Sequence, residues 1–377
     1  MKVAIIRTTL NKGSGQVMVM REISKRLIAL GHKIKIISRD IREETPHSIE
    51  IPVFANNFPL IRGFTFAFRV GLALNKFDII HTQYHPGIFT GNVGKHLLDL
   101  PHVLTYHGYA PIGIWRNPKQ RIKMIDHRLG SLFSFHLGID HFIPVSNYLK
   151  NELINFYNVP KNKITTVYNG IDTNRFNPNK NGDLIKKHYG LSNEPIILFL
   201  GRLAPYKGVQ YLLRAIPLIR KEIPNVKILI TGSARSDILD IKSMIKNLGI
   251  SKSLIFTGFI PDEQLANLYA ACDVFCFTSL WEGFGLPPAE ASAAGKPVVA
   301  FNKTAIPEVV QNGKTGLLVP PRNVKKLAEA IIFLLQNKKI REKLGKNGRK
   351  HVVNNFNWDK TVQKIIKIYK SLVNNEN

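Results

Sequence analysis

Short runs of apolar residues alternate with longer amphipathic stretches along most of the chain. The runs in the first half that predict strands are residues 3–6, 34–38, 78–82, 102–106 and 141–145. A second series follows at residues 196–200, 226–231, 254–257, 273–278, 297–301 and 316–319. Between several of these runs, apolar positions recur with helical spacing. This alternation is typical of parallel sheets with helices on both faces, so we predict two doubly wound α/β units.

The boundary between the two units is predicted near residue 180. Residues 174–183 are rich in turn formers and poor in apolar periodicity, which indicates a linker. A chain of 377 residues with 44% hydrophobic content is long for one core, so two domains are favoured. We therefore predict domains at 1–180 and 181–357, followed by one more amphipathic helix from Trp358.

The balance of charge is strongly basic. The chain has 53 Lys plus Arg against 26 Asp plus Glu, a formal net charge of +27. Net charge informs on association and not on fold, so an anionic membrane, a phosphorylated substrate, nucleic acid and a merely solvated basic surface all stay open. Nucleic acid is the weakest of these, because the basic residues are dispersed and no recognised nucleic-acid-binding signature accompanies them.

The compartment is predicted from cysteine usage and from the absence of targeting signals. Cys272 and Cys276 lie four apart in an apolar stretch, and a reducing compartment suits them best. The first residues form a predicted strand rather than a signal peptide, and no run of eighteen apolar residues occurs. We therefore expect a cytoplasmic protein, with peripheral attachment to the membrane as an open addition.

The segment 282–290 has the composition of an anion-binding loop at the start of a helix. It follows a predicted strand, and Pro287 and Pro288 suit a first helical turn, which places Gly285 and Leu286 at the helix N-terminus. Backbone amides there favour a phosphate. Glu282 and Glu290 flank the loop, so they are expected on opposite sides of that anion, one on sugar and the other on ribose hydroxyls.

A second motif, residues 199–208, follows the first strand of the second unit. Arg202 has a planar group suited to phosphate oxygens, and Lys207 carries a compact charge, so the two can neutralise a diphosphate. The spacing differs from that of a nucleoside-triphosphatase phosphate loop, which disfavours ATP hydrolysis. No Asp-x-Asp triplet occurs, so a divalent metal is not expected to hold the diphosphate.

Together, Gly201, Arg202, Lys207, Glu282 and Glu290 resemble the motif residues of the retaining glycosyltransferases of family 4. That family has the GT-B fold, in which two Rossmann-like domains face each other across a cleft. Similarity extends to the glycine loop at 12–15, the histidine motif at 105–108, Ser146, residues 169–178 and 312–319, and the last helix, which in this fold crosses back onto the first domain. One departure is Ser14, which separates two glycines that are commonly adjacent.

The resemblance implies transfer of a hexosyl group from a UDP- or GDP-sugar, with retention of configuration and without a metal or other cofactor. It assigns catalytic roles to His107, Arg202, Lys207 and Glu282. It assigns donor contacts to Gly15, Gly201, Gly232, Phe259, Gly283, Phe284, Gly285, Leu286 and Glu290. In these roles Glu290 binds the ribose, Glu282 and His107 bind the sugar, and the cations stabilise the leaving diphosphate.

Acceptors in this fold bind mainly to the first domain, so the acceptor is expected to be a glycan, a lipid or a lipid-linked sugar. Two segments of that domain, 58–69 and 116–128, place aromatic or cationic residues where a membrane interface would suit them, although a packed helix and a solvated helix are equally good interpretations. Two other functions remain open: a nucleotide-sugar epimerase of the same fold, and a non-catalytic nucleotide-sugar binding protein.

Overall fold

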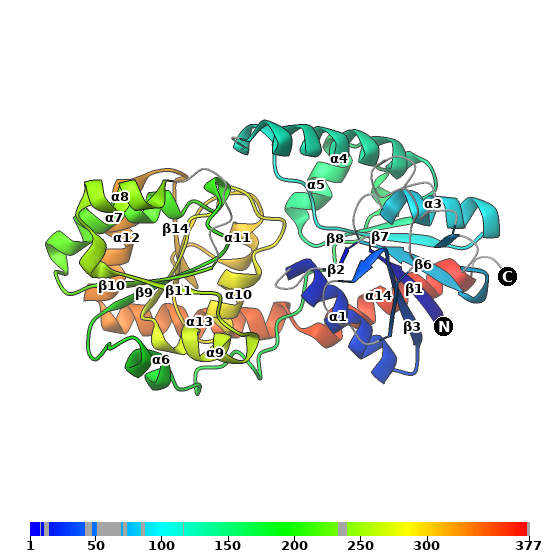
Figure 1. The fold of residues 1–377 in the computed structure, drawn as a ribbon. Coiled ribbons are helices and arrows are strands. Elements are labelled where there is room, and N and C mark those ends of the chain that lie inside the picture. The colour runs from blue at the N-terminus through cyan, green and yellow to red at the C-terminus, as the bar shows by residue number, and fades with distance from the viewer. Residues whose placement is uncertain are drawn as a thin grey trace. The chain divides into compact units, whose positions relative to one another are not determined.

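The computed structural model describes residues 1–7, 9–10, 15–41, 47–50, 69–70, 74–83, 87–115, 117–232 and 240–374. Within these ranges the chain forms two compact units. Unit 1 comprises residues 1–109, 122–170 and 358–377, and unit 2 comprises residues 110–121 and 171–357. Each unit has a sheet with helices on both of its faces (Figure 1).

Unit 1 is built on a parallel sheet of six strands. In spatial order these are β5 (Ser48–Glu50), β3 (Lys33–Ser38), β1 (Lys2–Ile6), β6 (Ile79–Thr82), β7 (His102–Tyr106) and β8 (His141–Pro144). Its helices are α1 (Gly15–Ala29), α3 (Gly87–Leu98), α4 (Pro118–His136, from Ile122 onward), α5 (Asn147–Asn155) and α14 (Trp358–Val373). A small parallel pair, β2 (Thr9–Leu10) and β4 (Asp40–Ile41), lies outside this sheet.

Unit 2 repeats the same strand order. Its strands are β11 (Leu254–Gly258), β10 (Lys227–Thr231), β9 (Ile196–Leu200), β12 (Val274–Phe277), β13 (Val298–Phe301) and β14 (Gly316–Val319). Its helices are α6 (Asp183–His188), α7 (Val209–Glu222), α8 (Ile241–Leu248), α9 (Asp262–Ala271), α10 (Leu286–Ala293), α11 (Ile306–Val309), α12 (Val324–Gln336) and α13 (Lys338–Asn355). Ile197 and Phe199 of β9 are fully buried and share one core with apolar residues of α7 and α12.

The predicted strands all occur in the sheets, with ends that differ by at most one residue. The structure adds β5, β2 and β4, which are too short to show a period in the sequence. Among the described residues no helix is long and apolar enough to cross a membrane. Of the first segment proposed for a membrane interface, 58–69, only Arg69 is among the described residues. Of the second, 116–128, all residues except Arg116 are described.

The structural division falls between Gly170 and Ile171, about ten residues before the boundary at 180 that the turn-rich composition predicts. The turn formers belong to unit 2 because their backbone is held there: the guanidinium group of Arg349 donates to the carbonyl oxygens of Thr173 and Phe176. Residues 110–121 also group with unit 2, which the sequence does not predict.

Helix α14 packs within unit 1, although it follows unit 2 in the sequence. Its first residue, Trp358, lies against Gly170, where a Cβ atom would come within 2.3 Å of the indole ring. Near its other end, the hydroxyl group of Tyr369 hydrogen-bonds the buried ring of His81 on β6. Only glycine fits at residue 170, so this contact ties the last helix to the end of the first long segment of the chain.

Candidate functional site: a cationic site at the strand ends of unit 2

The candidate site lies where the strand order of unit 2 reverses. Strands β9 and β12 are hydrogen-bonded neighbours, while the chain leaves β9 toward β10 on one side and β12 toward β13 on the other. Ligands of open α/β sheets bind at the carboxyl ends of the strands at such a reversal. The two motifs selected from the sequence, 199–208 and 282–290, directly follow these two strands.

Lys207 and Glu282 form an ion pair at this point. The Nζ atom of Lys207 lies 2.5 Å from Oε1 of Glu282, and the two side chains are only 15% and 13% exposed. Lys207 ends a short 3-10 turn, Pro205–Lys207, which is closed by Gly208 in the left-handed region at φ +77°. A Cβ atom at residue 208 would lie 2.0 Å from the carbonyl oxygen of Thr278, so glycine is required to bring this turn against the end of β12.

The ammonium group of Lys207 stays charged in this setting. Burial alone would lower the pKa of Lys207, but the carboxylate of Glu282 outweighs it, and the pKa is raised above its ordinary value. An ammonium group has three N–H donors, and one of them is directed at Glu282. The remaining donors have no hydrogen-bond partner among the residues that the structure describes, so an anionic ligand can accept from them.

Arg202 lies on the same aromatic ring as Lys207. Its guanidinium carbon is 5.6 Å from the ring centre of Tyr206, and Nζ of Lys207 is 5.2 Å from it. Arg202 also donates a hydrogen bond to the hydroxyl group of Tyr206. Trp115, from the segment 110–121 of unit 2, contacts the same ring at 5.1 Å. Tyr206 therefore holds two cations near each other, which favours a ligand with more than one negative charge.

The start of α10 supplies backbone donors. Gly285 is the N-cap at φ +108°, has no side chain to cap the helix, and is followed by Leu286, Pro287 and Pro288. The two prolines have no N–H, and the amide of Ala289 already donates to the carbonyl of Gly285. The amides of Gly285 and Leu286 are therefore the ones that this turn offers to an anion, in agreement with the predicted loop.

Glu282 is positioned by a residue that the sequence does not reveal. Its backbone N–H donates to Oγ1 of Thr304 at 3.1 Å, in the turn after β13. Thr304 has φ +53°, which is rare for a β-branched residue. Thr304 contributes through its contact with the backbone of Glu282, so no local sequence signal could identify it.

Glu290 lies one turn into α10 and is 6% exposed. Its Oε2 atom accepts a hydrogen bond of 2.8 Å from the hydroxyl group of Tyr269 on α9. Burial raises the pKa of Glu290 to about 7, although the Tyr269 hydrogen bond and the charge of Arg175 act in the opposite direction. Burial therefore disfavours the ionised form of this carboxyl group.

The remaining predicted donor residues of unit 2 follow strands β9 to β12 in the sequence. Gly201 and Gly232 end β9 and β10, and a Cβ atom on Gly232 would lie 2.0 Å from the carbonyl oxygen of Gly201. Gly283 is buried, and Phe284 packs its ring at 5.2 Å against Phe356. Phe259, 60% exposed, follows the edge strand β11 and is two strands further from β12 than Gly201.

Unit 1 has its own strand reversal, between β1 and β6, and buried polar groups lie there. The side chain of Gln83, directly after β6, is 1% exposed, and neither of its amide atoms has a partner among the described residues. His107, after β7, is 7% exposed and its Nε2 atom also has no described partner. Burial, followed by the charge of Arg7, lowers the pKa of His107 to about 3, so the ring is neutral.

The two unit 1 residues selected from the sequence differ in how they lie. His107 is buried at the end of its strand, as predicted, whereas Gly15 is exposed in the first turn of α1. The other residues of the predicted glycine loop, 12–14, lie outside the described residues. Gln83 was not predicted, because a lone glutamine after a strand carries no motif; only its burial without partners distinguishes it.

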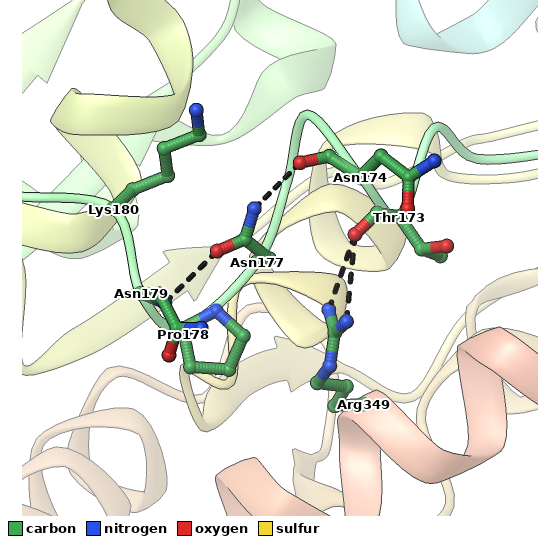
Figure 2. Close-up of a pocket in the computed structure, with 7 residues that line it drawn as sticks. All are labelled: Thr173, Asn174, Asn177, Pro178, Asn179, Lys180 and Arg349. Carbon is green, nitrogen blue, oxygen red and sulfur yellow. Dashed lines mark hydrogen bonds between the residues drawn. The ribbon is translucent and has the colours of Figure 1, made fainter.

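A cavity of about 550 Å³ lies elsewhere in unit 2, and its lining is shown in Figure 2. The lining residues are Thr173, Asn174, Asn177, Pro178, Asn179, Lys180 and Arg349. Arg349 donates to the backbone carbonyls of Thr173, Phe176 and Ala293, so its charge holds the chain entering unit 2 against α10 and α13. None of the buried polar side-chain atoms that lack a described partner belongs to these seven residues, and we assign the cavity a structural role.

Comparison with known proteins identifies the family. The model described as Glycosyltransferase Family 4 matches residues 13–175, and the model described as Glycosyl transferases group 1 matches residues 181–351. An uncharacterized glycosyltransferase of Methanocaldococcus jannaschii is 30% identical, over 79% of this chain and 76% of the relative. The chain belongs to glycosyltransferase family 4. The predicted family is thereby confirmed.

Two proteins of known substrate or ligand are also similar to this family 4 glycosyltransferase. The GDP-mannose-dependent alpha-(1-6)-phosphatidylinositol monomannoside mannosyltransferase of Mycobacterium tuberculosis is 31% identical over 60% of this chain and 61% of the relative. The crystal structure of Anabaena HepE in complex with UDP and glucose has a TM-score of 0.84 at 19% identity. The superposition covers 99% of this chain and 100% of the HepE chain. The predicted GT-B fold is confirmed by such neighbours.

The pKa of Glu290 leads to a prediction about stability. A carboxyl group whose pKa is near 7 in the folded protein and near 4.5 in the unfolded chain destabilises the fold as pH rises between these values. Glu290→Gln keeps an oxygen that accepts from Tyr269 but cannot ionise. We expect the free energy of unfolding of the variant to exceed that of the wild type by on the order of 2–3 kcal/mol at about pH 8, and to match it within about 1 kcal/mol at about pH 4.5.

Denaturant unfolding of both proteins across this pH range measures the difference. Glu222→Gln, at an exposed carboxyl group at the end of α7, is the matched control and should give no growing difference. A difference between Glu290→Gln and wild type that does not change with pH would contradict the assignment of a raised pKa to Glu290.

Proposed function

We propose that the enzyme transfers a hexosyl group from a UDP- or GDP-sugar to a hydroxyl group of a glycan, lipid or lipid-linked acceptor. The observation that carries the proposal is the cationic arrangement at the strand reversal of unit 2. There, Lys207 and Arg202 share the ring of Tyr206 beside a helix start with two available amides. This arrangement suits a diphosphate with a sugar attached.

Departure of the nucleoside diphosphate is the step that these groups would assist. Negative charge grows on the diphosphate as the bond from its oxygen to the sugar breaks. Lys207, Arg202 and the amides of Gly285 and Leu286 are already in place in the free protein, so they need no reorganisation to stabilise that charge. Because protein cations fill this role, we propose that the reaction needs no divalent metal or other cofactor.

The two carboxyl groups would bind the two ends of the donor. Glu282 is fixed by Lys207 through its side chain and by Thr304 through its backbone, which prepares it to accept hydrogen bonds from sugar hydroxyls. Glu290 has one oxygen committed to Tyr269, and its ionised form is disfavoured by burial. Two ribose hydroxyls donating to Glu290 would stabilise that ionised form on binding.

Unit 1 would supply polar groups for the sugar and the acceptor. The neutral ring of His107 can donate to or accept from a hydroxyl group, but it cannot contribute a positive charge at neutral pH. Gln83 adds one acceptor and two donors, none with a described partner. A substrate hydroxyl would satisfy groups that the protein itself leaves without hydrogen bonds.

The relatives support the substrate classes without deciding between them. One relative is named for GDP-mannose and a phosphatidylinositol monomannoside, and a solved neighbour holds UDP and glucose. We therefore keep both bases in the proposal, together with retention of the donor's anomeric configuration. Two free, buried cysteines suit a reducing compartment, so we place the reaction on the cytoplasmic side.

Glu282→Gln should separate binding of the diphosphate from transfer of the sugar. The amide keeps the size of the side chain but removes its charge, so hydrogen bonds to the sugar weaken. We expect kcat to fall by about 100-fold or more, while the free nucleoside diphosphate binds at least as tightly as it does to the wild type, because the ammonium group of Lys207 has lost its carboxylate partner. Glu263→Gln, an exposed carboxyl group on α9, is the matched control.

The readout is sugar transferred to acceptor, measured with and without a chelator. Full transfer by Glu282→Gln would contradict the site assignment. Consumption of donor without acceptor to give an isomeric nucleotide sugar would indicate an epimerase instead, and nucleotide-sugar binding without turnover would indicate a binding protein. Loss of transfer on chelation that a divalent cation restores would contradict metal independence.

Gln83→Leu tests whether the side chain of Gln83 in unit 1 binds substrate, because we expect this substitution to lower activity without lowering stability. Removing a buried amide that has no described partner should leave the free energy of unfolding unchanged or raise it by about 1–3 kcal/mol. If the amide binds substrate, kcat/KM should fall by about tenfold or more. Asn92→Leu is the contrasting variant, because the buried amide of Asn92 bonds Ser134 and His102 and its loss should destabilise the fold. Unchanged kcat/KM for Gln83→Leu would contradict a substrate role.

A further inference from the structure

Helix α4 of unit 1 carries an apolar surface that nothing in the described structure covers. Five large apolar side chains of this helix are exposed: Ile122 (67%), Ile125 (42%), Leu129 (55%), Leu132 (40%) and Phe133 (73%). No other helix among the described residues exposes more than two large apolar side chains. Single exposed apolar residues are ordinary on protein surfaces, but a cluster of this size marks an interaction site.

The five residues, which we call the α4 stripe, lie on one face of the helix. At 3.6 residues per turn they fall within an arc of about 100°, which runs about 17 Å along the axis. The opposite face is buried in unit 1, through Met124, His127, Ser131 and Phe135. The helix therefore packs one face of mixed polarity on unit 1 and exposes an apolar face that has no partner among the described residues.

Hydrogen bonds and an ion pair hold the buried face in place. Arg128 donates to the carbonyl oxygen of Tyr109 and lies 3.5 Å from Glu152 of α5. Ser131 donates to the hydroxyl group of Tyr109 at 2.8 Å. These contacts fix the rotation of α4, so the α4 stripe is presented by a helix that is anchored on its opposite side.

The charges beside the α4 stripe favour an anionic surface. Lys119, Arg121 and Lys123 are exposed and border the stripe on both sides of the same helix, Lys119 and Arg121 on its first turn, which groups with unit 2, whereas Asp126 is the one acidic residue of α4. The whole chain carries a formal charge of +27. A second copy of the chain would bring these cations toward their own counterparts, so self-association through the stripe is opposed by charge. Lipid headgroups of opposite charge complement both features.

We propose that α4 docks on the surface of an anionic bilayer, with the α4 stripe inserted among the lipids and the flanking cations at the headgroups. The helix would lie in the plane of the membrane, as amphipathic interfacial helices do. The cations of the predicted segment 116–128 and the apolar α4 stripe therefore lie on the same helix, so both can contact one membrane surface. Docking does not depend on the proposed sugar transfer, although it would bring the enzyme to a lipid acceptor.

Flotation of the full-length protein with vesicles tests the proposal without any donor or acceptor. We expect binding to phosphatidylglycerol vesicles and at least about tenfold weaker binding to phosphatidylcholine vesicles. The triple variant Ile125→Ser, Leu129→Ser, Phe133→Ser should lose at least about tenfold in affinity for the anionic vesicles. The matched control is Leu184→Ser, Leu218→Ser, Phe333→Ser, three exposed apolar residues of unit 2, which should bind as the wild type does.

A labelled variant keeps the test valid even if the triple variant folds poorly. Cys272 and Cys276 are both fully buried, and burial raises the pKa of each thiol, so neither should react with a thiol reagent in the folded protein. Phe133→Cys can then be labelled alone with a polarity-sensitive dye. Anionic vesicles should shift its emission to the blue, and the same dye on Leu184→Cys should not respond.

Each alternative outcome decides against the proposal. Equal binding of the triple variant and wild type, an equal loss in the control, or an unresponsive label at residue 133 would overturn it. Equal binding to both kinds of vesicle would overturn the role of the cations. A dimer that the triple variant converts to a monomer, with no vesicle binding, would show that a second copy covers the α4 stripe.

Discussion

The ion pair between Lys207 and Glu282 is the interaction on which the account of this site depends. Both side chains are largely buried, and removing one partner of such a pair leaves an uncompensated charge that costs about 3–5 kcal/mol. The pair joins the loop after β9 to the loop after β12, the two strands between which the sheet order reverses. Close packing of Gly208 on Thr278 also joins these two loops, and the hydrogen bond from Glu282 to Thr304 attaches the loop after β12 to the turn after β13.

These groups create a positive electrostatic potential that favours binding of an anionic ligand. Lys207 is positively charged and has donors to spare, Arg202 lies over the same tyrosine ring, and the start of α10 adds two amides. Glu282 is the only carboxylate among the described residues that pairs with these cations, so the site as a whole favours an anion. In unit 1 the buried polar residues are different in kind: His107 is neutral, and Gln83 carries no charge. Unit 2 therefore suits the charged part of a donor, and unit 1 suits neutral hydroxyl groups.

Much of this could be predicted from the sequence, because the signals concerned are local. Strand periodicity predicts eleven strands that all occur in the sheets, and the glycine and proline residues of 282–290 predict the start of α10, whereas the roles of Glu282 and Glu290 stay predictions. The compact units divide at residue 170 because Arg349 attaches the turn formers to unit 2, whereas the two family models leave the gap 176–180, next to the predicted boundary at 180. Thr304, Gln83 and Trp115 could not be identified, since each matters through a contact or a missing contact that only the fold creates. The cations beside the α4 stripe are evident in the sequence, but the stripe itself is not, because helical spacing alone does not show which apolar residues of a helix are buried.

Calorimetric titration with nucleoside mono- and diphosphates, on wild type and Lys207→Met, tests the central claim most directly. The claim is that Lys207 binds the phosphate furthest from the nucleoside. We expect Lys207→Met to lose about tenfold or more in affinity for UDP or GDP, whichever the wild type binds, and less than about threefold for the corresponding monophosphate. Equal affinity of Lys207→Met and the wild type for the diphosphate would contradict it and would reduce the ion pair to a structural contact.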